Sequence, residues 1–350
     1  MLIYLFMAFL PLVVCYYYQK LPVERQTLRA RDSYLLWVMV PVFTSIAIRG
    51  YYMGADTGSY IDDFYRFASM DFDSAVMDTR MEPGFVFFSK SIALITSSAK
   101  IFQVIYTSIY FVCIYSFIKR FEGTIPFYFL FFFITLGEYL FFFTGVRQCL
   151  AISVCLYSYK YIIEKKWVYF VPIIALMYTI HHSVIFFVIV YFLVHFKVSK
   201  YNIVLYFITL YFASTYLVDA QSYLNERLDY TYEIEQADSG GIFLTLIALF
   251  SAASYHQFSK KMATDSTIRY LFNINIITLF FWVLRLQTRV AERPSFYFLP
   301  FSCVLFAYLY TKTKNKSAKY IMIIIPVVYY LYRFTGTFIT FVPYKTFFFD

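Results

Sequence analysis

The sequence predicts an all-α polytopic membrane protein, and three observations support this fold class. The 350 residues are 61% hydrophobic with a mean hydropathy of +0.62, well above the roughly 45–50% apolar content of soluble chains. Apolar runs of fifteen to twenty residues recur from one terminus to the other. No polar stretch reaches the roughly 50 residues of a small soluble domain. We therefore expect a single integral membrane domain over residues 1–350.

The apolar runs predict about twelve transmembrane helices. The first run lacks the basic region and the cleavage site of a signal peptide, so it should remain as a helix. The twelve are expected at residues 2–18, 34–48, 102–118, 124–143, 145–163, 167–180, 183–196, 201–218, 241–258, 268–284, 294–310 and 320–339. The segment at 85–99 is only fifteen residues long and contains Lys90. It is therefore expected to be a re-entrant or amphipathic segment on the outer side.

Short basic loops predict the orientation of these helices. The loop at residues 20–31 carries Lys20, Arg25, Arg29 and Arg31, which places it in the cytoplasm and the N-terminus outside. The later basic loops fall on the same side if 85–99 does not cross, and would be inverted if it did. Two longer polar loops, 50–82 and 219–240, then face outward and contain 13 of the 21 acidic residues.

Arginine and lysine divide unequally across this topology. The inner side has thirteen lysines and five arginines, whereas nine of the twelve outer basic residues are arginines. A guanidinium binds phosphate oxygens in pairs and stays protonated. Arginines on the outer side therefore predict an anionic ligand there, and a lipid-anchored phosphate fits best because the acidic outer loops would repel a freely diffusing anion. This distribution does not indicate a nucleic-acid partner, despite the net charge of +9.

Three arginines, Arg285, Arg289 and Arg293, follow one another at four-residue intervals where an apolar helix ends. On a continuous helix this spacing places them along one narrow face. The sequence predicts that this face binds a pyrophosphate. The alternative is that the long side chains reach the membrane interface without a ligand.

A further arginine, Arg147, lies about one turn inside the outer end of the helix at 145–163. The helix N-terminus adds a partial positive charge at this point. Arg147 is therefore predicted to bind an anion together with that helix end.

Three residues on the outer side are candidates for acid–base chemistry. Asp56 follows a glycine-rich turn, where it can act as a general base or form an Asx-turn or a helix N-cap. Glu82 precedes Pro83-Gly84, a turn that aims it into a cavity or ends the loop. His182, next to His181, can shuttle a proton or be hydrated in a turn.

Several other chemistries lack sequence support. The five cysteines lie in apolar segments without metal-ligand spacing. There is no Cys/His ligand set, glycine-rich phosphate loop or Gly-x-Ser-x-Gly motif. We therefore expect neither a metal nor another cofactor.

These motifs, in this order, resemble the EpsG family, a branch of the Wzy-like O-antigen and capsule polymerases. The resemblance covers nearly the whole chain. It rests on Gly54-Ala-Asp56 with Tyr60, Glu82-Pro-Gly-Phe85, Arg147-Gln148 with Ala151, His182-Ser183, Arg289 ahead of Tyr297-Phe298, and Pro343-Tyr344.

The resemblance implies a GT-C-like glycosyltransferase that acts on the outer face of a bacterial inner (plasma) membrane. Its substrate would be an undecaprenyl-pyrophosphate-linked oligosaccharide, and its further partners the lipid bilayer and a chain-length regulator. Arg147 and Arg289, with Arg285 and Arg293, would bind the pyrophosphate, and Asp56, His182 or Glu82 would be the base. The alternatives are a lipid-linked oligosaccharide flippase and a membrane acyltransferase.

Overall fold

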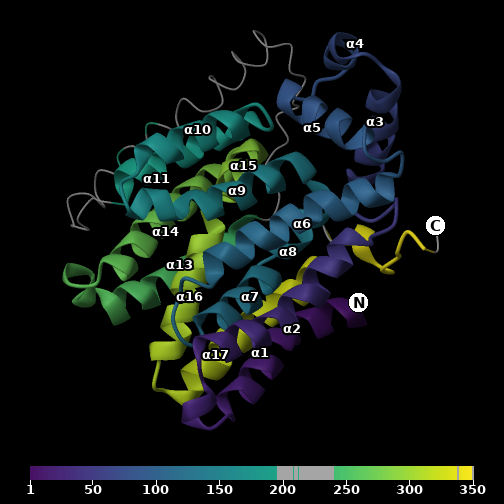
Figure 1. The fold of residues 1–350 in the computed structure, drawn as a ribbon. Helices are drawn as coiled ribbons and strands as arrows, with labels where there is room; N and C mark the ends of the chain where they lie inside the picture. Colours follow the sequence, from purple (N-terminus) through teal and green to yellow (C-terminus); the bar gives the residue numbers. More distant parts are fainter. Residues whose placement is uncertain (195–207, 209–211, 213–239, 337–338, 349–350) are drawn as a thin grey trace. The chain divides into compact units, whose positions relative to one another are not determined.

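The structure is a computed structural model that describes residues 1–194, 208, 212, 240–336 and 339–348 (Figure 1). Within these ranges the regular elements are helices, together with one isolated β-bridge between Arg49 and Thr346. The chain forms two compact units, Met1–Ile185 with Tyr310–Asp350, and Phe186–Leu309. The helix predicted at 201–218 and the loop predicted at 219–240 fall almost entirely outside the described residues.

The first unit is a group of packed helices. Its helices are α1 (Leu2–Gln19), α2 (Leu28–Ala47), α3 (Thr57–Ser69), α4 (Phe72–Met77), α5 (Pro83–Ala93), α6 (Ala99–Ile118), α7 (Ile125–Thr135), α8 (Glu138–Thr144), α9 (Val146–Ile163), α10 (Trp167–Tyr178) and α17 (Lys316–Arg333). Helix α1 packs against α2 and α7, and α17 also packs against α7 (Figure 1). Helix α6 packs against α2 and α9, and α9 packs against α10. This arrangement brings segments from both ends of the chain into one core.

Four described helices are long and apolar enough to cross a membrane: α1, α6, α13 (Gly240–Phe258) and α14 (Ser266–Arg285). The bent pair α7 and α8 would be a fifth. The predicted all-α membrane protein is thus confirmed for the part of the chain that the structure describes. The count of twelve spans stays a prediction.

The expected single helix at 124–143 is wrong, because the chain bends by 61° between α7 and α8. The break lies at Gly137, whose φ is +93°. Only glycine adopts this left-handed conformation readily, and it commonly ends a helix.

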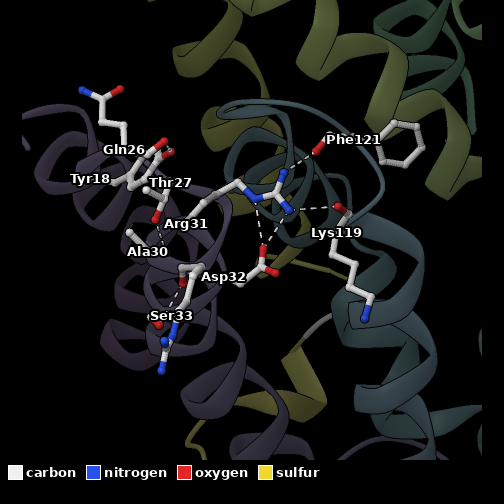
Figure 2. A network of polar contacts seen from close by, with 10 residues as sticks. Tyr18, Gln26, Thr27, Ala30, Arg31, Asp32, Ser33, Lys119 and Phe121 are labelled. Carbon is white, nitrogen blue, oxygen red and sulfur yellow. Dashed lines mark hydrogen bonds and ion pairs between the residues drawn. The ribbon is translucent and has the colours of Figure 1, made fainter. Parts of the chain in front are cut away.

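Arg31, in the first turn of α2, contacts the segment that follows α6 (Figure 2). Its side chain is 4% exposed. It donates hydrogen bonds to the carbonyls of Phe121 (2.8 Å) and Lys119 (2.9 Å) and pairs with Asp32 at 2.7 Å. These carbonyls follow the last turn of α6, where backbone acceptors lack partners within the helix. The start of α2 and the end of α6 therefore lie at the same end, which we call the Arg31 end.

The contact between Arg31 and the residues after α6 also indicates whether the segment near 85–99 crosses the membrane. Between Arg31 and Lys119 the chain runs away along α2 and returns along α6. Helix α5 has 11 residues and is therefore about 16 Å long, short of the roughly 30 Å hydrocarbon core. Both observations agree with a segment near 85–99 that does not span.

The predicted outward loop at 50–82 contains α3 and α4 as well as turns. Helix α3 buries Tyr60, Phe64 and Phe67 on one face. A polar helix with one apolar stripe is typical of an element that lies on a core. Arginine 49, just before this region, is the largest fully buried side chain of the described residues.

The second unit contains α11 (Val188–Leu193), α13, α14, α15 (Glu292–Ser295) and most of α16 (Leu299–Lys312). Helix α14 packs against α11, α13 and α15. The prediction that Arg285, Arg289 and Arg293 share one helix face is wrong. Helix α14 ends at Arg285, the chain turns, and a 3-10 turn at Arg289–Ala291 precedes α15.

Candidate functional site

Glu82 is a buried carboxylate at the start of α5, with 7% of its side chain exposed. One carboxylate oxygen forms an ion pair with the guanidinium of Arg147. The other lies 3.0 Å from Nδ1 of His181 and accepts a hydrogen bond from the backbone amide of His182 at 3.2 Å. We call Glu82, Arg147 and His181 the Glu82 cluster.

A close helix contact brings Glu82 to His181, which lies 99 residues further along the chain. The Gly84 amide donates to the Thr179 carbonyl at 2.8 Å. A Cβ at position 84 would lie 2.2 Å from Oγ1 and 2.6 Å from the carbonyl oxygen of Thr179. Only glycine allows this approach. The first turn of α5, at Pro83-Gly84, therefore directs Glu82 toward the residues that follow α10. That Glu82 points into a cavity stays a prediction.

Arg147 lies at the first turn of α9, as predicted. Its Nε donates to the hydroxyl of Tyr60 at 3.4 Å, in addition to the ion pair with Glu82. The side chain is 22% exposed, so the guanidinium contacts both protein and solvent. Such a group can exchange one anionic partner for another without a large change in position.

The Glu82 cluster lies away from the Arg31 end of the first unit. The ring of Tyr159, near the end of α9, lies 5.9 Å from the ring of Phe117, near the end of α6. The last turns of α6 and α9 are therefore together at the Arg31 end. Arg147, at the first turn of α9, must lie toward the opposite end.

The surroundings of Glu82 determine its ionisation. Burial alone would raise the pKa of the carboxyl group, but the hydrogen bond with His181 and the charge of Arg147 outweigh burial and lower the pKa to about 2. Glu82 is therefore ionised at neutral pH. A carboxylate with so low a pKa is a weak base.

The two adjacent histidines have different environments. His181 is 13% exposed and His182 is 51% exposed. Nδ1 of His182 is 3.9 Å from the nearest Glu82 oxygen, beyond hydrogen-bonding distance. Its ring lies against that of Tyr178, with centroids 4.7 Å apart. Sequence reasoning selected His182 as the site residue, but the structure places His181 in the cluster, and its proximity to Glu82 has no local sequence signal.

Asp56 is the exposed residue immediately before α3. Its carbonyl accepts from the amide of Tyr60 at 3.1 Å, whereas its side chain makes no capping hydrogen bond to the helix. The N-cap alternative for its carboxylate is thus not the arrangement seen. Tyr60 is also the residue whose hydroxyl contacts Arg147, so Asp56 lies one helical turn from the edge of the Glu82 cluster.

The model of the EpsG family matches residues 33–346, nearly the entire chain. The chain belongs to the EpsG family. Members of this family are Wzy-like polysaccharide polymerases, so this EpsG-family protein has a polymerase-type role in polysaccharide biosynthesis at a membrane. No curated protein and no solved structure matches the chain.

One buried arginine of this EpsG-family protein was not singled out from the sequence. Arg49 is fully buried at the end of α2. It donates to the Thr57 hydroxyl at 3.0 Å, the Tyr106 hydroxyl at 2.6 Å and the Ile46 carbonyl at 2.8 Å. It thereby ties α2 and α6 to the start of α3, the helix that carries Tyr60. Its place directly after an apolar helix was the available sequence signal.

The remaining candidate arginines belong to the second unit. Arg285 is 6% exposed, and its Nε donates to Glu292 at 2.9 Å. Arg289 and Arg293 have exposed side chains on the 3-10 turn and on α15. Their assignment to pyrophosphate binding stays a prediction. Among the described residues there is no group of His, Cys, Asp and Glu side chains that could hold a metal ion.

Proposed function

We propose that this protein is a polysaccharide repeat-unit polymerase with a GT-C-like fold of about twelve spans. It transfers a glycan from undecaprenyl pyrophosphate to a lipid-linked acceptor at the outer face of the bacterial inner (plasma) membrane, with its N-terminus outside. The observation that carries this proposal is the Glu82 cluster, a half-buried arginine beside acid–base groups, away from the Arg31 end. The family supplies the expectation of a polymerase.

Arg147 has the central role in the proposed reaction. Its guanidinium binds the donor diphosphate and stabilises the negative charge that develops when the bond to the sugar breaks. In the structure it pairs with the carboxylate of Glu82, whose charged oxygens resemble those of a phosphate in their demand for N–H donors. A diphosphate carries more negative charge than one carboxylate and competes for the exposed side of Arg147.

The other predicted site residues have supporting roles in this proposal. Arg285, Arg289 and Arg293 contribute further phosphate contacts. Asp56, His182 and Glu82 were the candidates for the base that takes the acceptor proton. The low pKa of Glu82 disfavours it as that base.

The test is polymerisation by purified protein in detergent, given polyprenyl-pyrophosphate-linked oligosaccharide and no nucleotide sugar. Wild type should produce a ladder of products. Arg147→Ala should lower the rate by about 10²-fold or more, as for loss of an oxyanion-stabilising donor. The matched control is Arg29→Ala, which removes an exposed arginine from α2 and should leave the rate unchanged.

Loss of Arg147 also leaves a buried carboxylate without its cation, so folding is checked by thermal unfolding. Arg147→Lys keeps the charge but loses the planar fork and should restore stability more than rate. A folded Arg147→Ala protein that makes full-length polymer would contradict the role of Arg147. Wild-type protein that only moves the unchanged lipid-linked glycan across liposomes would instead identify a transporter.

A further inference from the structure

We propose that His181, not its neighbour His182, accepts the proton of the acceptor hydroxyl, and that Glu82 is the positioning residue that holds its imidazole. This inference rests on the proposed polymerase function and assigns its base. It follows from the difference between two adjacent side chains that the sequence presents as equivalent.

The contact with Glu82 fixes the orientation of the His181 ring. Its Nδ1 lies 3.0 Å from a carboxylate oxygen of Glu82. An ionised carboxylate can only accept a hydrogen bond, so Nδ1 must carry the proton. In the neutral ring the basic lone pair is then on Nε2. A carboxylate that fixes the tautomer and orientation of a histidine is the arrangement used to activate hydroxyl nucleophiles.

The same carboxylate oxygen of Glu82 also binds the backbone. It accepts from the amide of His182 at 3.2 Å, so the His181 side chain and the backbone directly after it are both held to Glu82. Glu82 is held in turn by the contact between Gly84 and Thr179. The imidazole of His181 is therefore preorganised, which lowers the cost of placing it for proton transfer.

His182 lacks these features. Its Nδ1 is 3.9 Å from Glu82, and half of its side chain is exposed. Its ring makes no hydrogen bond to Glu82 that would select one tautomer, and solvent competes for the ring nitrogens.

The charged and titratable groups around His181 make its strength as a base depend on whether the donor is bound. Glu82 faces it from the start of α5, Arg147 from α9, with Tyr60 from α3 bound to Arg147, and His182 is adjacent in the chain. With Arg147 paired to Glu82, the positive guanidinium opposes protonation of His181. When a diphosphate binds Arg147, its negative charge offsets that opposition, and the imidazole becomes a stronger base.

The proposed step is balanced in atoms and charge. The acceptor oxygen forms a bond to the anomeric carbon of the donor glycan and gives its proton to Nε2 of His181. The bond from the anomeric carbon to the diphosphate oxygen breaks, and its electron pair stays on the polyprenyl diphosphate beside Arg147. His181 keeps the proton until the products leave, because Nε2 is shielded from solvent in the structure, and then gives it to water.

The experiment compares His181→Asn with the matched control His182→Asn. The asparagine amide at position 181 can still donate to Glu82 but has no basic nitrogen in place of Nε2. We expect His181→Asn to lower kcat by about 10²–10⁴-fold, with unchanged binding of undecaprenyl pyrophosphate and an unchanged unfolding temperature. His182→Asn should lower kcat far less than His181→Asn, because His182 is not the base in this assignment.

The pH dependence of the rate separates a base from a structural residue. The wild-type rate should fall at low pH as the base becomes protonated, and His181→Asn should lose this dependence. In Glu82→Gln the drop in rate should occur at lower pH, because the carboxylate no longer stabilises the imidazolium. Glu82→Asp should return the drop part of the way to its wild-type pH. A His181→Asn protein with the wild-type rate, or a large loss of rate in His182→Asn alone, would overturn the assignment of His181 as the base. The Arg147→Ala variant would then still test the polymerase function. Absence of polymer with wild-type protein would refute the proposed function, and this inference with it.

Discussion

Replacing Gly84 with alanine should disrupt the contact that places Glu82. The new Cβ would lie 2.2 Å from Thr179 Oγ1, 2.6 Å from its carbonyl oxygen and 2.7 Å from its carbonyl carbon. Overpacking of this kind costs about 1–3 kcal/mol, and losing the Gly84 hydrogen bond costs about 1 kcal/mol more. The better helix propensity of alanine offsets about 1 kcal/mol. The net expectation is a loss of about 1–3 kcal/mol.

Thermal unfolding in detergent, followed with the polymerisation assay, measures this effect. Gly84→Ala should unfold at a lower temperature than wild type and should polymerise more slowly even while folded, because Glu82 moves away from His181. Gly241→Ala is the matched control, since no atom of the described residues outside its own part of α13 lies within 4 Å of its Cβ. Adding Thr179→Ala should recover only part of the loss, because two of the three close atoms belong to the backbone. An unchanged unfolding temperature for Gly84→Ala would refute the reasoning.

Two further predictions concern the charges of the first unit. Because the pKa of Glu82 falls from 4.5 to about 2 on folding, its contribution of roughly 3 kcal/mol should be present above pH 4.5 and lost as the pH falls toward 2. Unfolding temperatures measured from pH 7 to pH 2 should therefore fall less steeply for Glu82→Gln, and parallel curves would contradict this expectation. Arg31→Ala removes charged hydrogen bonds to the carbonyls of Lys119 and Phe121 and should cost about 1.5–3 kcal/mol. Arg29→Ala, an exposed change on the same helix, should leave the unfolding temperature unchanged, and an equal loss in both variants would argue against the Arg31 contact.

Hydropathy was sufficient to place the long helices. Helices α1, α6, α13 and α14 begin and end within about three residues of their predicted limits, because continuous apolar runs have a strong local signal. A helix after Asp56 was considered only as one alternative. The extent of α3 was not predicted because its signal is a stripe of buried residues within a polar segment. The bend at Gly137 was also missed, although glycine within an apolar run was its visible cause.

For the site, the sequence identified single residues but not the contacts between them. Charged residues next to apolar helices drew attention to Arg147 and Glu82, because such residues are costly and rarely incidental. The sequence could not pair them, since their contact depends on how α5, α9 and α10 pack. The same packing distinguishes His181 from His182, which sequence spacing cannot do. The prediction that Arg285, Arg289 and Arg293 share one helix face was wrong for a local reason. A four-residue spacing aligns side chains only within a continuous helix, and α14 ends at Arg285.

The contact between Gly84 and Thr179 has a consequence for biosynthesis. Chains are made from the N-terminus, so a nascent protein holds Glu82 long before the ribosome reaches Thr179 and His181. Arg147 arrives first and can neutralise the carboxylate, whereas the imidazole and the docking surface for α5 arrive together at the end of α10. A chain that stops before α10 would lack both the proposed base and the Thr179 contact that places Glu82, so the proposed site can form only after α10 has been made.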